Sequence, residues 1–376
     1  MSISDRELVE LRQIAQGIAG NPFSAPQTAA RHLVLSQGQH LNGLIASLAY
    51  RTNDATVDGV VDAFNDGMLA RGYPMRGTIF GASTDDIGWI TDLCGPRQLN
   101  SAAKRRAGHG IDEEMLDRAL SVAGEEFARQ EPHYGVPAAS VEDLGAAWEA
   151  ANIPTGQGRR YHLIFTLMAG GKLVYGPITR SSSGSALVHL IVPRSTWVPN
   201  ESSLEARFNG DSKAAVTEFL QRYLYGHGPA TIRDFAWWTK LPLGVIRTSA
   251  GEATAALEDY GVDHDGETLY GRPGLREERS QRASELSTGR LLAPFDELVL
   301  GYPNRLRMLT SDQHKQLVPG NNGVFKNGML RAGRLIGTWR ASSGANGNRA
   351  TFTPFTGELS ARAEREFLRA HANYPS

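Results

Sequence analysis

A repeated order of elements is the strongest constraint on how this chain can fold. In the first hundred residues, apolar positions at helical spacing predict three helices, and the glycine-rich segment 71–81 that follows alternates like a β-hairpin. The same order recurs twice further along the chain. The predicted helices cover residues 5–18, 27–50, 56–69, 112–129, 141–151, 160–168, 212–225, 231–239 and 243–257, with strand segments at 172–178 and 262–270.

Helices followed by a hairpin are the order of a winged-helix unit, and three such units are expected. After Leu291 the pattern changes to short apolar runs separated by Gly, Pro and Asn, which predicts β-hairpins and then a terminal helix over 360–372. The expected division is 1–100, 101–205, 206–290 and 291–376. Residues 271–290 contain five arginines without apolar periodicity and are expected to form a solvated linker.

Composition narrows the class of protein. A length of 376 residues exceeds what one hydrophobic core usually serves, which agrees with several subdomains. The single cysteine, Cys94, excludes an internal disulfide and a cysteine-rich zinc site, and no H-E-x-x-H spacing is present, so neither a metal nor a cofactor is expected. No run approaches the roughly 20 apolar residues of a membrane span, and a polar start to the chain favours the cytoplasm.

Charge is distributed unevenly along the chain. The formal net charge is −1, but residues 303–350 carry eight basic residues against one acid, which gives +7 there and −8 elsewhere. A basic C-terminal region on an acidic body is the pattern expected for a surface that contacts phosphates. A solvated basic face with no partner would give the same count, and this alternative stays open.

Gln37 and Gln39 form the most informative short motif, because two amide side chains can hold one water molecule. Residues two apart share a face in an extended segment but not on a helix. Gly38 between them favours a break in the helix. The alternative is a pair of surface glutamines on an amphipathic helix.

Several longer segments resemble a known family. They are Arg222–Thr231 with Asp234–Trp238, Leu291–Glu297 with Leu300–Tyr302, and Gly337–Arg340. Together they resemble the bacterial winged-helix DNA-binding proteins that include the AlkZ-type DNA glycosylases. Arg76-Gly77-Thr78 and Gln37-Gly38-Gln39 fall where that family carries its Arg-Gly-Thr and Gln-x-Gln motifs. Gly38 departs from the aliphatic or small residue usual at the middle position, which leaves a catalytically silent relative as an alternative.

The resemblance implies an α+β fold, with tandem winged-helix units in a C-shaped array and a small β-rich element at the C-terminus. It also implies a monofunctional, cofactor-free DNA glycosylase, in which Gln37 and Gln39 are catalytic. The implied substrates are N7-alkylated purines in double-stranded DNA, including bulky adducts and interstrand crosslinks. The implied biological setting is base excision repair and self-resistance to a DNA-alkylating natural product, by a cytoplasmic, nucleoid-associated monomer without an obligate protein partner.

Further residues are interpreted within this hypothesis. His40 is a candidate for contact with the lesion or only a helix cap, and the Asp296-Glu297 pair is either an acid–base pair or structural. Trp237 and Trp238 are expected to belong to the core rather than to stack on bases. The expected DNA-binding residues are Arg76, Thr78, Lys326, Arg331, Arg334 and Arg340. The alternative function is a non-enzymatic winged-helix transcription regulator or lesion-binding protein.

Overall fold

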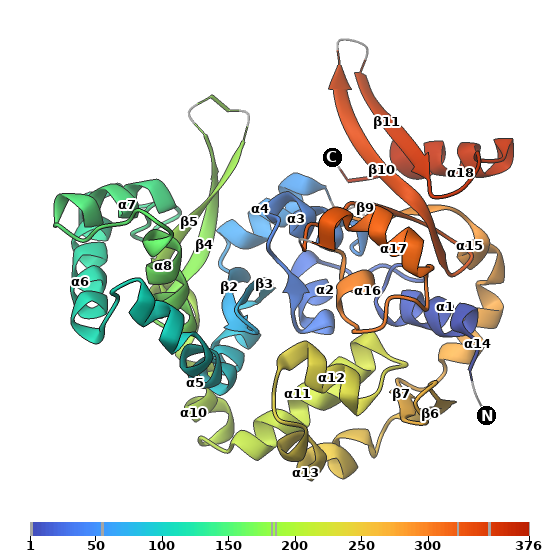
Figure 1. Cartoon of the computed structure of the whole chain (residues 1–376), viewed down its shortest axis with the longest axis horizontal. Coiled ribbons are helices and arrows are strands. Elements are labelled where there is room, and N and C mark those ends of the chain that lie inside the picture. The colour runs from blue at the N-terminus through green and yellow to red at the C-terminus, as the bar shows by residue number, and fades with distance from the viewer. Residues whose placement is uncertain are drawn as a thin grey trace. The chain divides into compact units, whose positions relative to one another are not determined.

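The structure is a computed structural model that describes residues 3–53, 56–181, 183–184, 186–321, 323–344 and 347–375. The chain divides into two compact units. The first contains residues 1–57 and 217–376, and the second contains residues 58–216. Figure 1 labels most of the elements of both units, which are numbered in chain order.

The second unit begins with a helix and a β-hairpin, as the sequence predicts. Helix α4 (Val57–Asn65) precedes β2 (Leu69–Met75) and β3 (Thr78–Ser83), which pair antiparallel. Arg76 and Gly77 form the two-residue turn with φ angles of 59° and 67°, the positive values that a tight hairpin of this handedness requires. The wing expected at residues 71–81 is therefore a strand–turn–strand element.

Helix α5 (Thr84–Gly108) is longer than expected. The sequence predicts a boundary between the first two units near residue 100, but α5 runs across it, is 25 residues long and has Pro96 inside it. Residues 97–107 are rich in Ala, Arg, Gln, Leu and Lys, which favour helix, and this stretch continues the helix beyond the interruption at Pro96.

The rest of the second unit places helices beside a sheet of order β3-β2-β4-β5 (Figure 1). Strands β4 and β5 pair antiparallel. Trp148 and Leu163 are fully buried in the core of this unit. The remaining elements are α6 (Glu113–Arg129), α7 (Val141–Ala150), α8 (Arg159–Ala169), β4 (Leu173–Arg180), β5 (Leu187–Pro193), α9 (Arg194–Trp197), the 3₁₀ turn Asn200–Ser202 and α10 (Leu204–Phe208).

The first unit is mainly helical in its first and middle segments. Its opening elements carry the glutamine motif, and its middle elements include the predicted helix trio, of which α11 begins in the preceding unit. These elements are α1 (Asp5–Ala15), α2 (Pro26–Leu33), β1 (Ser36–Gln37), α3 (Leu41–Tyr50), α11 (Ser212–His227), α12 (Ile232–Thr239), α13 (Leu243–Thr254), β6 (Glu258–Val262) and β7 (Thr268–Gly271).

The prediction of a solvated linker over 271–290 is wrong. This segment forms α14 (Leu275–Gln281) and α15 (Ala283–Ser287), and its Leu275 and Leu286 are 0% and 1% exposed. Arg276 and Arg279 pair with Glu7 and Glu10 of α1 at 3.2 and 2.8 Å. The arginines therefore attach the segment to α1, a long-range pairing that local periodicity does not reveal.

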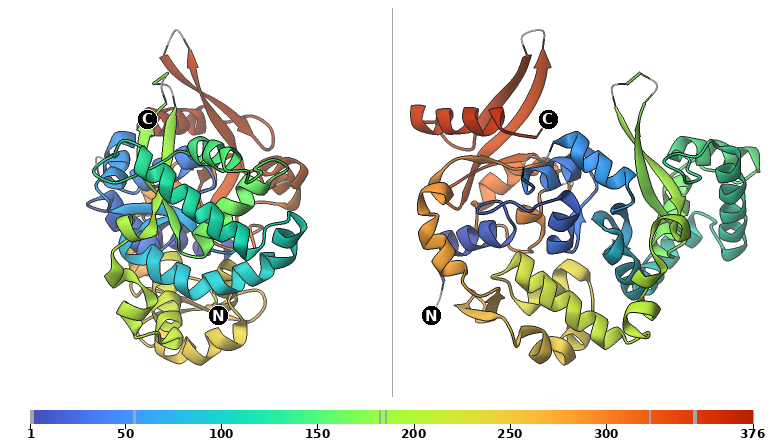
Figure 2. Two further views of the ribbon diagram at one scale, coloured as in Figure 1. Left: turned by 90° about the vertical axis from the view of Figure 1, so that its left-hand side faces the viewer. Right: turned by 180° about the vertical axis from the view of Figure 1, so that it is seen from behind.

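A β-rich element and a terminal helix close the chain, as predicted. The sheet has the order β11-β10-β9-β8, and Figure 2 shows α18 beside the β10–β11 hairpin. On one face, Trp339 pairs in register with Phe352, and the Phe352 ring packs 5.8 Å from Phe367 of α18. The elements are β8 (Arg290–Leu291), α16 (Glu297–Leu300), α17 (Ser311–Leu317), the 3₁₀ turn Pro319–Asn321, β9 (Asn327–Arg331), β10 (Arg334–Gly344), β11 (Gly347–Pro354) and α18 (Ala361–Ala372).

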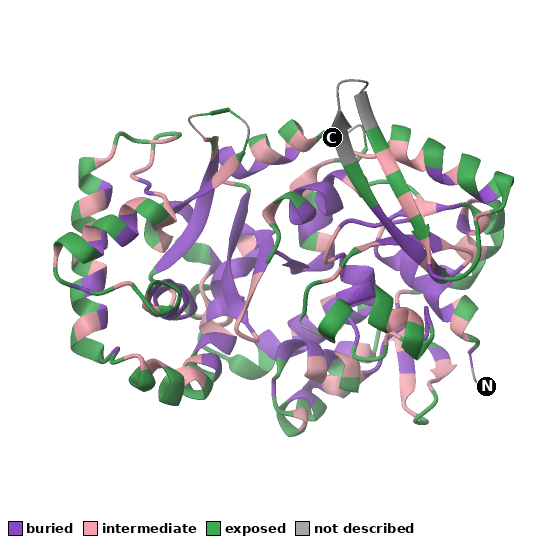
Figure 3. Cartoon of the chain, turned by 45° about the horizontal axis from the view of Figure 1, so that its top comes forward, coloured by how far each residue is buried: buried purple, intermediate pink, exposed green. Residues whose placement is uncertain are grey.

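The fold thus mixes helices with small antiparallel sheets, in agreement with the expected α+β class. Figure 3 shows buried residues on the strands and on one side of many helices. Within the described residues, no helix has both the length and the apolar character needed to cross a membrane.

Candidate active site

The glutamine motif lies in extended backbone rather than in a helix. Helix α2 ends at Leu33, and Val34 then adopts φ 64° and ψ −57°. The N–H of Leu35 donates to the carbonyl of Leu33 at 2.7 Å, which closes a strained three-residue turn. Ser36 and Gln37 follow as strand β1. The alternative of two glutamines on an amphipathic helix is therefore wrong.

The two glutamines have different surroundings. Gln37 is 5% exposed, whereas Gln39 is exposed to solvent. Within the described part of the chain, the side-chain Oε1 of Gln37 is buried and has no hydrogen-bond partner. A buried carbonyl oxygen is normally satisfied by protein or by ordered water, so this atom offers an acceptor to a water molecule.

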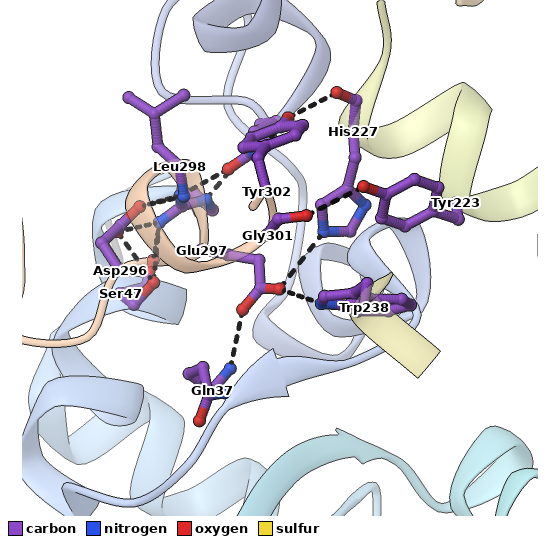
Figure 4. A network of polar contacts seen from close by, with 12 residues as sticks. Gln37, Ser47, Tyr223, His227, Trp238, Asp296, Glu297, Leu298, Gly301 and Tyr302 are labelled. Atoms are coloured by element: carbon purple, nitrogen blue, oxygen red, sulfur yellow. Dashed lines mark hydrogen bonds and ion pairs between the residues drawn. The ribbon is translucent and has the colours of Figure 1, made fainter. Parts of the chain in front are cut away.

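The backbone of Gln37 is held by a buried carboxylate. Its N–H donates to Glu297 Oε2 at 3.0 Å, while the indole Nε1–H of Trp238 donates to Glu297 Oε1 at 2.6 Å (Figure 4). His227 Nε2 lies 3.7 Å from the same Oε1, and Glu297 is 1% exposed. Residues from β1, α11, α12 and α16 meet at this carboxylate.

The neighbouring carboxylate has a different partner. Asp296 accepts from Arg51 Nη1 and Nη2, both at 2.9 Å, and caps α16 by accepting from the N–H of Leu298 at 2.9 Å. The Oγ of Ser47 also donates to it at 3.2 Å. Because both carboxylates are engaged by buried donors, the structural reading of the Asp296-Glu297 pair is favoured over a free acid–base pair.

His40 caps the helix that follows the motif. Its Nδ1 accepts from the N–H of Gly43 at 2.9 Å, which satisfies one of the first N–H groups of α3. Helix α3 also approaches the Pro294 segment closely, because a Cβ on Gly43 would lie 2.7 Å from the Pro294 carbonyl oxygen. The residues after the motif are thus fixed at the N-terminus of α3.

His32 of α2, which precedes the motif, has a lowered pKa. Burial lowers the pKa of His32 to about 4, although its Nε2 lies 2.6 Å from the Ala15 carbonyl oxygen. Phe23 packs on the ring at 4.7 Å. The surroundings of His32 therefore favour the neutral form of its imidazole.

The expected DNA-binding residues fall into two groups. Arg76 and Thr78 lie at the β2–β3 turn of the second unit, where the Gly77 N–H donates to Gln98 Oε1 at 3.0 Å. Lys326, Arg334 and Arg340 are exposed in the β-rich element of the first unit. A groove of about 470 Å³ on that sheet is lined by Lys326, Asn327, Thr338, Trp339, Arg340, Thr351 and Thr353.

Arg331 differs from the other expected DNA-binding residues. Its Nε donates to Glu366 of α18 at 2.8 Å, and this hydrogen bond is the main cause that lowers the pKa of Glu366 to about 2. A phosphate would have to compete with this carboxylate for Arg331.

Trp238 is part of the core, as expected, whereas Trp237 is only half-buried. It is fully buried and packs against Tyr223, His227 and Phe219, with ring centroids 4.8, 5.1 and 5.7 Å away. Its role as a donor to Glu297 is not visible in the sequence, because residues 37, 238 and 297 are far apart and share no spacing pattern.

Among the described residues, no group of three or more His, Cys, Asp or Glu side chains could hold a metal.

The structure thus places Gln37 in buried, extended backbone and places Lys326, Arg334 and Arg340 at exposed positions of the β-rich element. The chain belongs to the AlkZ-like DNA glycosylase family, whose model matches residues 30–375. The fold is similar to that of the DNA glycosylase AlkZ from Streptomyces sahachiroi, with a TM-score of 0.69 and 18% identity over 100% of this chain and 98% of that chain. A comparison with curated proteins gave no match.

Proposed function

We propose that this protein hydrolyses the N-glycosidic bond of N7-alkylated purines in double-stranded DNA, including bulky adducts and interstrand crosslinks. Gln37 and Gln39 orient the attacking water, and the product is a free base and an abasic site without strand cleavage. Membership of the AlkZ-like DNA glycosylase family supports the reaction class. The lesion class and the roles of the residues are the proposal.

One observation carries the proposal: the buried side-chain oxygen of Gln37 has no hydrogen-bond partner among the described residues. An unsatisfied buried carbonyl costs roughly 1–3 kcal/mol, so its retention on a fixed backbone favours a role as an acceptor. The amide oxygen of Gln37 would accept from the hydrolytic water. Gln39, exposed two residues further on, would supply the second acceptor.

The chemistry suits an amide rather than a strong general acid. An N7-alkylated guanine already carries positive charge in its ring, and it departs without prior protonation. The remaining needs are a positioned water and a partially negative group near the developing charge on C1′ of the sugar. Positioning of reactants can contribute up to roughly 7–11 kcal/mol in ideal cases. Neutral amides therefore suffice for a cationic leaving group.

We propose that the exposed basic residues bind the DNA backbone. Lys326, Arg334 and Arg340 would contact phosphates from the β-rich element, and Arg76 and Thr78 would contact DNA from the β2–β3 turn. We assign Arg331 a lesser part, because Glu366 already engages it. Tandem winged-helix units would present these surfaces to a bulky lesion, in DNA repair or in self-resistance to an alkylating natural product.

The test uses a duplex with one N7-methylguanine, incubated with the wild-type protein or with the Gln37→Ala/Gln39→Ala double variant. Hot alkali then cuts the strand at any abasic site. We expect scission by the wild type, a loss on the order of 100-fold or more in the variant, and negligible release of unmodified guanine.

The control is the strand before alkali treatment, which should stay intact. Tight duplex binding without scission by either protein would instead support the regulator or lesion-binding function. Efficient release of unmodified guanine would contradict the proposed chemistry.

A further inference from the structure

Glu297 is a buried carboxylate that accepts hydrogen bonds from an indole N–H and a backbone N–H. Burial of a carboxylate costs several kcal/mol unless hydrogen bonds compensate. Arg51, which lies in the same buried network, directs Nη1 and Nη2 to Asp296. Glu297 instead receives the indole N–H of Trp238 on Oε1 and the backbone N–H of Gln37 on Oε2.

The two carboxylate oxygens of Glu297 therefore accept hydrogen bonds from different donors. The indole that binds Oε1 is fixed, because Trp238 is 0% exposed and packs against Tyr223 and His227. Tyr223 is fixed in turn by donating its hydroxyl hydrogen to the Gly301 carbonyl at 2.8 Å (Figure 4). With Oε1 held in this way, Oε2 is fixed where it accepts from the N–H of Gln37.

Direct participation of Glu297 in the reaction is disfavoured by the same contacts. The residue is 1% exposed, and both of its oxygens already accept hydrogen bonds. A water that attacks the sugar would need an acceptor, and the buried Oε1 of Gln37 has no hydrogen-bond partner among the described residues. Glu297 therefore acts on the reaction through the backbone of Gln37.

We infer that Glu297 is a positioning residue for the glycosylase reaction, with Trp238 as its support. The carboxylate fixes the main chain of Gln37 in the extended conformation and so aims the side-chain amide at the water. This inference rests on the proposed function of Gln37. It adds a residue far along the chain to the machinery that sets the catalytic geometry.

The substitution Glu297→Gln tests the inference with little change in volume. A carboxamide has one acceptor oxygen, whereas two N–H donors, from Gln37 and Trp238, point at this side chain. One donor would then face the NH₂ group. We expect the single-turnover rate on the N7-methylguanine duplex to fall roughly 10- to 100-fold, since small misplacements can cost that much, with Kd within about twofold of wild type.

A second variant separates positioning from general damage. Trp238→Phe removes the indole donor, so in the Glu297→Gln/Trp238→Phe double variant the single carbonyl oxygen is free to accept from Gln37. We expect the double variant to recover most of the rate of Trp238→Phe alone. Glu277→Gln, at an exposed carboxylate, is the matched control and should leave the rate unchanged.

Backbone order provides a readout that does not depend on activity. Hydrogen exchange of the peptide covering residues 35–40 should quicken in Glu297→Gln and slow again in the double variant. A wild-type rate in Glu297→Gln, or a lost rate that Trp238→Phe does not restore, would overturn the inference. If the Gln37→Ala/Gln39→Ala variant cleaves normally, the proposed function fails as well; if only Glu297→Gln cleaves normally, the inference alone fails.

Discussion

Two regions of the first unit differ in whether their polar side chains are buried or exposed. The glutamine segment, residues 35–43, is held by buried groups of residues 294–302, including a carboxylate that accepts a backbone N–H. The β-rich element, residues 326–354, instead turns one face toward α18 and exposes Lys326 and Arg340 on the sheet. We propose from this difference that the first region sets the geometry for the reaction and that the second supplies charge for DNA binding.

The largest expected difference is in the unfolding free energy that is lost when a buried or an exposed ion pair is removed. Asp296→Ala would leave Arg51, which is 0% exposed, without its carboxylate, and should lower the free energy of unfolding by about 3–5 kcal/mol. Urea unfolding measures this. Asp312→Ala breaks the exposed Lys315 pair near the β-rich element and should produce no measurable change. Equal losses of unfolding free energy in both variants would contradict this difference between buried and exposed ion pairs.

The regions should also respond differently to pH. His32, next to the glutamine segment, has a pKa of about 4 when folded and 6.5 when unfolded. A depressed pKa means that the unfolded chain takes up the proton first, so stability is lost as pH falls from 6.5 toward 4. His32 should contribute about 2 kcal/mol to the loss of stability between pH 7 and pH 5, and His32→Gln should remove this contribution.

The ion pair that joins the sheet to α18 serves as the pH control. The pKa of Glu366 is about 2 when folded and 4.5 when unfolded, so the pair is fully present above pH 4.5 and is lost only as pH falls toward 2. Glu366→Gln should therefore differ from wild type by the same amount at pH 7 and pH 5. A change between those two pH values would contradict this assignment.

Glycine substitutions sharpen the contrast in packing. Gly43→Ala would place a Cβ 2.7 Å from the Pro294 carbonyl oxygen and should destabilise the protein by about 1–2 kcal/mol, with slower base release. Gly251→Ala, at an open position of helix α13, should stabilise by about 0.5–1 kcal/mol. Thermal melts of both variants give the comparison, and a neutral Gly43→Ala would show that α3 can shift.

A further prediction concerns DNA binding by the exposed basic residues. Lys326→Ala/Arg340→Ala should weaken DNA binding by about tenfold at low salt and reduce the slope of log K against log salt by about two, one for each lost phosphate contact. Fluorescence anisotropy at four salt concentrations measures both quantities. An unchanged slope would indicate that the sheet face does not contact phosphates.

Much of the architecture follows from local sequence. Apolar periodicity gives most helices within a few residues, and the glycine-rich turn at Arg76-Gly77 marks a hairpin that the structure contains. The sequence wrongly predicts a linker at α14–α15, because the arginines of this segment pair with glutamates of α1 about 270 positions earlier. Long-range charge pairing leaves no periodic signal.

The site was only partly predictable for the same reason. The extended backbone at Gln37 follows from Gly38 and the end of α2, and His40 was recognised as a candidate cap. The link from Gln37 to Glu297 and Trp238 has no counterpart in local spacing. Such contacts depend on the packing of distant segments, and only the three-dimensional arrangement reveals them.

The most direct test measures rate and affinity together on one duplex with a single N7-methylguanine. Gln37→Ala and Lys326→Ala/Arg340→Ala are compared with wild type by single-turnover cleavage at saturating protein and by Kd. We expect Gln37→Ala to lose rate while keeping its affinity, and the basic-face variant to lose affinity while keeping its saturated rate. If both variants change the same quantity, the separation of geometry from charge is wrong.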